Sequence, residues 1–114
     1  MRRIATLALI LLTPMAALAD HTPAPAAEAE IAAEAYAMVN HKMHAAMGAE
    51  STGDTDADFV IGMRAHHIGA VEMAEVLLAH GTDPATRELA QTIIDAQTDE
   101  IAWMTDWLVT HGYE

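Results

Sequence analysis

Cysteine is absent from the 114 residues of the chain. Its absence excludes disulfide bonds, on which small exported domains usually depend. It also excludes thiolate ligands, so a soft metal ion could be bound only through methionine or histidine. Without disulfides, a domain of this size must be stabilised by helix packing, by a bound metal ion or by association with another chain.

Positive charge is scarce. The chain carries five Lys and Arg residues against seventeen Asp and Glu residues, and its formal net charge is −12. Such an acidic surface repels nucleic acids and anionic membranes, whose phosphates have the same sign of charge. We therefore expect no nucleic-acid partner. The same surface can weakly concentrate cations, although an ordinary solvated helical surface has a similar composition.

A long apolar run occurs only at the N-terminus. Residues 1–20 read MRRIATLALILLTPMAALAD, in which two arginines precede a short apolar stretch. Ala17 and Ala19 stand at the small-residue positions of an A-x-A-like cleavage site. We interpret residues 1–19 as a cleaved signal peptide, which is too short and wrongly flanked for a membrane anchor. This interpretation predicts a periplasmic or secreted protein.

No segment alternates polar and apolar residues in the manner of a strand. Residues 20–27 are rich in proline and alanine and are predicted to form a flexible tail. Three helices with short antiparallel connections are predicted to follow, over residues 28–47, 55–80 and 84–111. The predicted fold is therefore an all-α, three-helix antiparallel bundle over residues 28–114. With only three helices, a homodimer that completes a bundle is a further expectation.

Residues with known capping roles mark the limits of these helices. The stretch TDAD, in which Asp58 takes the place of the usual Glu, resembles a capping box. It predicts that the second helix begins at Thr55 or at the next residue. Gly81 supplies the C-terminal stop of that helix. Asp83 is the expected N-cap of the third helix, with Pro84 at the first helical position.

The predicted second helix carries histidine and methionine where a helix ordinarily carries leucine. Wound at about 100° per residue, it forms a stripe within an arc of about 120° that comprises Phe59, Met63, His66, His67, Ala70, Met73 and Leu77. This arc is the natural core-facing side, so two histidines are predicted to interrupt an apolar seam. Buried imidazoles need partners for both ring nitrogens and otherwise cost free energy.

The other two predicted helices carry matching donors. One face of the first helix holds Asn40, Met43, His44 and Met47. One stripe of the third helix holds Gln97, Glu100, Met104, Leu108 and His111. Every helix therefore offers at least one methionine, and two of them offer methionine together with histidine.

Methionine and histidine together indicate copper. Thioether sulfur is soft and uncharged, so it binds Cu(I) and the surrogate Ag(I) but is a poor ligand for Mg²⁺ or Ca²⁺. Imidazole binds copper in either oxidation state, which adds Cu(II) as a candidate. Thiols oxidise outside the cytoplasm, so methionine suits an oxidising compartment. A neutral thioether also leaves the affinity moderate, which favours exchange of the ion with a copper-delivery protein.

Other interpretations of these residues stay open. A methionine on a helix face ordinarily fills the core, and His66 with His67 could form a polar seam or a pH-sensitive element. Met-rich faces also suit promiscuous protein contacts, as in a helical interaction module or a stress chaperone. An enzyme is not expected, because the sequence lacks Glu-x-x-His pairs, H-E-x-x-H, a haem-attachment motif and G-x-S-x-G.

Several motifs make the sequence resemble a known family. They are D-x-D-F-V from Asp56, M-x-x-H-H-x-G-A-V-x-M-A from Met63, L-A-x-x-I-I-x-x-Q-x-x-E-I-x-x-M-x-x-W-L from Leu89 to Leu108, and a shorter M-H-x-x-M from Met43. In these motifs the chain resembles the exported bacterial proteins of the domain of unknown function 305 family, which includes CopM-like copper-binding proteins. One departure is Arg64 and Ala65, where the family commonly has Ile-Pro. Helical winding places Arg64 off the histidine stripe.

The resemblance implies a ferritin-like helical bundle that binds copper and takes part in copper resistance or trafficking. The metal ligands it implies are Met43, His44, Met47, Met63, His66, His67, Met73 and Met104. Gln97 and Glu100 are then the partners that orient the imidazoles. We expect Met63, His67 and Met104 at the centre of the site, in a protein that sequesters copper or hands it on.

Overall fold

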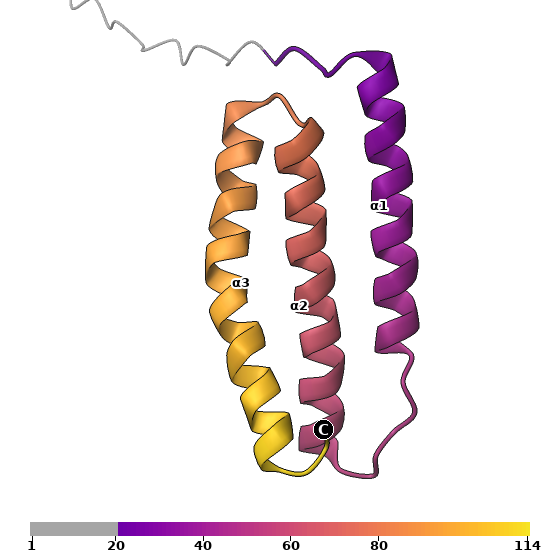
Figure 1. Ribbon diagram of the computed structural model, residues 1–114, viewed down its shortest axis with the longest axis vertical. Coiled ribbons are helices and arrows are strands. Elements are labelled where there is room, and N and C mark those ends of the chain that lie inside the picture. Colours follow the sequence, from indigo (N-terminus) through magenta and orange to yellow (C-terminus); the bar gives the residue numbers. More distant parts are fainter. Residues whose placement is uncertain (1–20) are drawn as a thin grey trace, which may run out of the picture.

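The computed structural model describes residues 21–114, and over this part of the chain it contains three helices and no strand (Figure 1). They are α1 (Ala26–Met47), α2 (Thr55–His80) and α3 (Pro84–Thr110). Successive helices run antiparallel, and α2 lies between α1 and α3 (Figure 1). The all-α class and the three antiparallel helices are therefore confirmed. Helix α1 begins slightly earlier, and α3 ends slightly earlier, than the sequence predicted.

The N-terminus of α2 is capped by Asp54, which precedes the predicted capping box. Its carboxylate accepts hydrogen bonds from the backbone N–H groups of Asp56 and Ala57. Asp58, the expected reciprocal partner in the box, instead accepts a hydrogen bond from Ser51 in the preceding loop. This bond lowers the pKa of the Asp58 carboxyl group below its ordinary value. The predicted capping box was therefore wrong, although the predicted start of the helix was right.

The turn between α2 and α3 follows the prediction more closely. Asp83 caps α3 by accepting a hydrogen bond from the backbone N–H of Thr86 at 2.8 Å, and Pro84 occupies the first turn. Gly81 ends α2 with φ at −78°, so the left-handed conformation is not what requires glycine here. A Cβ at Gly81 would lie 2.7 Å from the backbone oxygen of Leu77. Close approach of the backbone to the preceding turn therefore requires glycine at this position.

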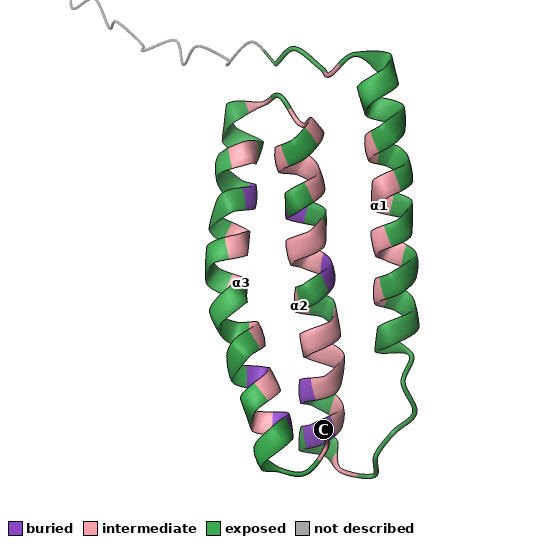
Figure 2. Ribbon diagram, viewed as in Figure 1, coloured by how far each residue is buried: buried purple, intermediate pink, exposed green. Residues whose placement is uncertain are grey.

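The core lies between α2 and α3. Val60, Met104 and Leu108 form its buried cluster, and Leu108 has no exposed surface. Ala74 and Ala90 are buried further along the same two helices. Full burial of a side chain such as Leu108 contributes roughly 1.5–3 kcal/mol relative to exposure. Most buried residues accordingly follow the line along which these two helices meet, whereas Gly69 is buried on the side of α2 that faces α1 (Figure 2).

The last residues of the chain fold back onto α2 and form a C-terminal hook, residues 112–114. The Tyr113 hydroxyl donates to Asp54 Oδ2 at 2.7 Å, which lowers the pKa of Asp54 and raises the pKa of Tyr113. Arg64 donates to Glu114 Oε2 at 2.8 Å, and this bond raises the pKa of the guanidinium group. Arg64 therefore points away from the histidine stripe, as its helical position predicted, and reaches Glu114 of the C-terminal hook.

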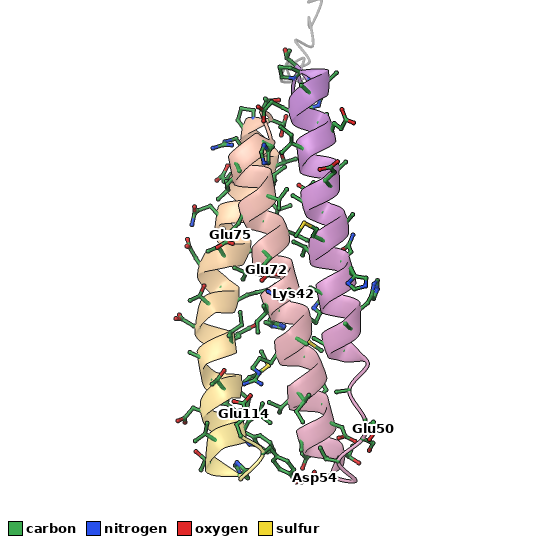
Figure 3. All side chains as sticks on the ribbon, turned by 45° about the vertical axis from the view of Figure 1, so that its right-hand side comes forward. Lys42, Glu50, Asp54, Glu72, Glu75 and Glu114 are labelled. Atoms are coloured by element: carbon green, nitrogen blue, oxygen red, sulfur yellow. The ribbon has the colours of Figure 1, made fainter. Side chains whose placement is uncertain are left out.

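Helix α1 contacts α2 alone and has no contact with α3. None of the residues of α1 is buried. The two helices approach closely at Gly69, where an added Cβ would lie 2.5 Å from Met43 Sδ. Met43 therefore occupies the space that a side chain at this position of α2 would take. Lys42 and Glu72 form an ion pair, and their side chains point toward each other between the two helices (Figure 3).

The prediction that the histidine stripe of α2 faces the core was wrong for the centre of the stripe. Because α1 and α3 flank α2 without meeting, they leave the middle of the stripe open. Phe59 is 63% exposed, Met73 is 37% exposed and His66 is also exposed. The helices thus form one layer, and we call the side that carries the stripe the open face. Its main residues are Tyr36, Phe59, Met63, His66, Ala70, Met73, Leu77, Leu89, Ile93 and Trp103.

Two predictions concern the N-terminal part of the chain and the membrane. The predicted signal peptide, residues 1–19, lies outside the described residues. Within the predicted tail, the Thr22 carbonyl accepts a hydrogen bond from the Thr82 hydroxyl at 2.5 Å, so this part of the tail contacts the turn between α2 and α3. Among the helices of residues 21–114, none combines the length and apolar character needed to cross a bilayer.

Candidate functional site

A depression on the open face brings together side chains from α2 and α3. It is lined by Phe59, Met63, His67, Glu100, Trp103 and Met104. We call it the Met–His depression. It contains the three residues expected at the centre of a metal site, together with Glu100, one of the two expected orienting partners.

Core packing positions the two sulfur atoms of the Met–His depression. Met104 is 4% exposed and belongs to the buried cluster of α2 and α3, while Met63 is partly buried and packs against that cluster. The step from Met63 to His67 is about one helical turn, so both side chains leave the same side of α2. The two thioethers and the imidazole are therefore held by the α2–α3 hairpin itself.

The imidazole of His67 has a partner at each ring nitrogen. Nδ1 lies 2.9 Å from the backbone oxygen of Met63, and Nε2 lies 2.5 Å from Oε2 of Glu100. The side chain of His67 is 14% exposed, whereas that of Glu100 is 61% exposed. The ring is thus anchored on the buried side of the depression, and its acidic partner lies at the solvent edge.

These contacts determine which ring nitrogen of His67 is available to a ligand. Both partners are hydrogen-bond acceptors, so the two bonds form together only when the ring carries a proton on each nitrogen. A backbone carbonyl at Nδ1 retains its bond in the neutral ring as well, and the Nε2 lone pair is then free for a metal ion. A metal ion at Nε2 would therefore replace the contact between this nitrogen and Glu100.

His66 and Gln97 belong to the predicted site but do not line the depression. The ring centroids of His66 and His67 are 6.2 Å apart, and His66 is exposed on the open face. Gln97 is half-buried, and its Oε1 atom is buried without a hydrogen-bond partner. An unpaired buried amide oxygen costs free energy, so the position of Gln97 is not explained by the hydrogen bonds of the described residues.

The remaining predicted ligands lie elsewhere on the molecule. Met43 is packed against Gly69, at the interface of α1 and α2. Met73 lines a separate apolar groove, with residues of all three helices. His44 is exposed on α1, and Met47 is 45% exposed near the loop that follows this helix. The depression therefore combines donors from two helices, whereas the sequence had predicted donors from three.

Oxygen and nitrogen donors alone do not form a metal site in the described part of the chain. Within residues 21–114, no three histidine or carboxylate side chains lie close enough together to hold a metal ion. An ion bound in the Met–His depression would therefore depend on the thioethers of Met63 and Met104. Thioether ligands select soft ions and bind hard, oxygen-seeking cations poorly.

Two features of the depression were not identified from the sequence. The partner of His67 Nδ1 is the backbone carbonyl of Met63, and the four-residue spacing of these residues was the available signal. The second feature is Trp103, which is 61% exposed at the rim of the depression. Its position three residues after Glu100 places it on the same side of α3, which could have indicated this role.

The fold and the depression define a small all-helical domain with an open thioether–imidazole cluster on its α2–α3 hairpin. The chain belongs to the family described as "Domain of unknown function (DUF305)", which matches residues 10–108. The resemblance is thus confirmed at the level of the family, and the match includes every predicted ligand. A comparison with curated proteins finds no match.

Proposed function

We propose that the chain is an exported copper-binding protein that sequesters Cu(I) or hands it on, without catalysing a reaction. The observation that carries the proposal is the convergence of Met63, His67 and Met104 on one depression. Two thioethers and an imidazole suit a soft, monovalent ion. Copper is then the cargo of the site, and Ag(I) is a surrogate that does not change its oxidation state.

Each side chain has a distinct role in this proposal. The thioethers of Met63 and Met104 supply softness, and Nε2 of His67 supplies the nitrogen donor. Glu100 balances the positive charge of the ion, while the backbone oxygen of Met63 orients the imidazole through Nδ1. Gln97 of α3 is the further orienting partner that the sequence predicted. A nitrogen and a carboxylate oxygen side by side also give Cu(II) a place to bind.

The open rim of the depression favours exchange of the ion. Phe59 and Trp103, which flank the donors, are 63% and 61% exposed. A ligand from a copper-delivery protein could therefore approach the ion before His67 or a thioether releases it. Uncharged thioethers leave the affinity moderate, which suits transfer of the ion better than permanent storage.

Two parts of the proposal rest on the sequence. The predicted signal peptide would place the protein in the periplasm or outside the cell, where a thioether resists the oxidation that inactivates a thiol. The resemblance to CopM-like proteins supports a role in copper resistance or trafficking and a ferritin-like arrangement of the helices.

Competition with a Cu(I) chelator measures the affinity of the proposed site. We expect replacement of both His66 and His67 by Ala to lower the Cu(I) affinity by at least about tenfold. Met63→Leu and Met104→Leu should each lower it as well, because leucine keeps a similar volume but offers no donor. An unchanged titration of the double histidine variant would contradict the proposal.

Matched controls separate loss of a ligand from a general effect of substitution. Met38 is 74% exposed on α1, so Met38→Leu removes a thioether far from the depression. His41→Ala likewise removes an exposed imidazole from α1. We expect both controls to keep the Cu(I) affinity of the unmodified protein. Circular dichroism of each variant verifies that the helices are retained.

A helical interaction module without a specific metal is the alternative, and the exposed apolar residues of the open face favour it. Thermal unfolding with and without Ag(I) discriminates between the two functions. A ligand at a hundredfold excess over its Kd stabilises the folded state by about 2.7 kcal/mol, which raises the Tm. An unchanged Tm would support the interaction module and contradict copper binding.

A further inference from the structure

We propose that two copies of the chain pair through their open faces, antiparallel about a two-fold axis that passes close to His66. The pairing rests on the shape and charge of the face and does not depend on copper. One consequence rests on the proposed function: the two Met–His depressions meet at the centre of the dimer, so that both copies contribute to one metal site.

The open face is almost uncharged, although the chain is strongly acidic. Among the described residues that line the Met–His depression and the neighbouring apolar groove, Glu100 alone carries a formal charge. The whole chain has seventeen Asp and Glu residues, and of those in the described part Glu100 is the one that lines either of these two hollows. Two copies can therefore bring this face together with little like-charge repulsion.

The open face carries a protrusion at one end and a groove at the other. Phe59 and Trp103 protrude beside the Met–His depression, with exposures of 63% and 61%. The apolar groove lies nearer the turn between α2 and α3 and is lined mainly by Tyr36, Ala70, Met73, Leu77, Leu89 and Ile93. Along α2, the positions of Phe59, Ala70 and Leu77 fall on one side of the helix. The protrusion and the groove therefore share one face.

When one surface carries both a protrusion and a groove, a two-fold axis can place the protrusion of each copy in the groove of the other copy. The α2 part of the groove is centred between Ala70 and Leu77, so the point midway between this centre and Phe59 is close to His66. An axis there places Phe59 and Trp103 of each copy over the groove of the other. The partner that fits this face is therefore a second copy, because this chain supplies both halves of the contact.

The dimensions of the face match a stable dimer. Helix α2 has 26 residues, which gives a length of about 39 Å. Two interhelical spacings add a width of about 20 Å. The outline of the face is thus about 800 Å² per copy, which is large enough to contain an interface of the usual size of about 800 Å² per partner. Pairing would also cover apolar side chains that the single layer leaves in water, including Leu89 at 59% exposure.

Sedimentation velocity of the purified, metal-free protein tests the pairing. Intact mass spectrometry of the same sample identifies the residue at which the purified chain begins. We expect a dimer, and we expect Phe59→Glu and Trp103→Glu each to weaken it by at least about tenfold. Met38→Glu and Val109→Glu are matched controls, because both residues are exposed and neither lines the open face. A monomeric parent, or a dimer that Phe59→Glu leaves intact, overturns the proposal.

Disulfide cross-linking tests the antiparallel arrangement, and the absence of cysteine from the chain makes it specific. In the His66→Cys variant, the two copies of Cys at this position should form a disulfide with each other. Both positions lie near the axis, so their Cα atoms come within the distance of about 7 Å that a disulfide spans. Phe59→Cys should not link to itself, since the two positions would lie about 20 Å apart. It should link instead to Leu77→Cys in a mixture. Self-linking of Phe59→Cys overturns the antiparallel arrangement.

Addition of Ag(I) to the dimer tests the shared site separately from the pairing. We expect Ag(I) to lower the dimer Kd, because an ion that binds both copies favours the paired state. If Ag(I) binds and the dimer Kd does not change, the shared site is overturned. If Ag(I) does not bind at all, the proposed copper function fails, while a metal-free dimer would still establish the pairing.

Discussion

The two sides of α2 are built differently. Toward α3, the interface contains the buried side chains of Val60, Met104 and Leu108 and is closed at its end by the C-terminal hook. Toward α1, Met43 packs against Gly69 and Lys42 pairs with Glu72, but no residue of α1 is buried. The α2–α3 hairpin is therefore the stable unit of the domain, and α1 is an attached helix.

This difference explains where the candidate site lies. A site that must hold donors at fixed positions is best placed on rigid elements. The Met–His depression takes all of its lining residues from α2 and α3. Met43 and His44, on the weakly held α1, lie outside it. The donors that share the depression are thus those on the two helices with a common core.

The largest expected effect comes from the core of the hairpin. Leu108→Ala should lower the free energy of unfolding by about 2–5 kcal/mol, because it leaves a cavity at a fully buried position. Met43→Ala on the α1 side should cost clearly less, because Met43 is only half-buried. Urea denaturation followed by circular dichroism measures both values. Equal losses for the two variants would contradict the proposed difference between the two interfaces.

A smaller effect is expected from a methyl group at the α1 interface. In Gly69→Ala, the new Cβ would overlap with Met43 Sδ, and such overpacking costs about 1–3 kcal/mol. Gly62→Ala is the matched control, because nothing lies within 4 Å of an added Cβ there. This control should be neutral or stabilise the protein by up to about 1 kcal/mol, through the higher helix propensity of alanine.

The cause of the Gly69 effect can be isolated with a double variant. If Met43 is the group that clashes, Gly69→Ala should lose most of its cost in a Met43→Ala background. Urea denaturation of the four proteins in this cycle gives the coupling energy. An unchanged cost of Gly69→Ala in that background would show that Met43 does not define the α1 contact.

The smallest expected effect concerns the C-terminal hook and depends on pH. The hydrogen bond from Tyr113 helps to lower the pKa of Asp54 below its ordinary value of 3.8. A carboxyl group whose pKa is lowered by folding adds stability above that value, and this stability is lost as the pH falls through its folded pKa. Tyr113→Phe should therefore lower the Tm at neutral pH, and the difference should shrink in acid.

A matched hydroxyl deletion controls the pH experiment. Tyr36→Phe removes a phenolic hydroxyl from α1, far from the C-terminal hook, and should give a Tm difference that does not change with pH in acid. Thermal unfolding by circular dichroism between pH 7 and about pH 3 measures both variants. A Tm difference for Tyr113→Phe that stays constant over this range would rule out Asp54 as its cause.

The helices and their limits could be predicted from the sequence because their signals are local. Asp83 and Pro84 begin α3 as predicted, since a cap acts over a few residues. The predicted capping box failed where two acceptors competed: Asp54 caps α2, while Asp58 bonds to Ser51 in the loop. Residue type alone does not decide between two neighbouring aspartates, because loop geometry determines which one reaches the free N–H groups.

The candidate site could be predicted in part. Met63, His67 and Met104 were expected at its centre, and the structure brings them to one depression. Helical periodicity places residues on a face, but it does not show which neighbouring helix covers that face. Met43 and Met73 therefore shared the predicted pattern although they lie at other contacts.

The sequence by itself determined the three helices, their order and the stripe of methionine and histidine on α2, because these follow from caps, periodicity and residue chemistry over short stretches. Only the tertiary structure decided that α1 and α3 flank α2 without meeting, and hence that the centre of the stripe is exposed. The physical reason is that the angle between two packed helices depends on contacts between distant residues, such as Met43 with Gly69, which no local pattern encodes.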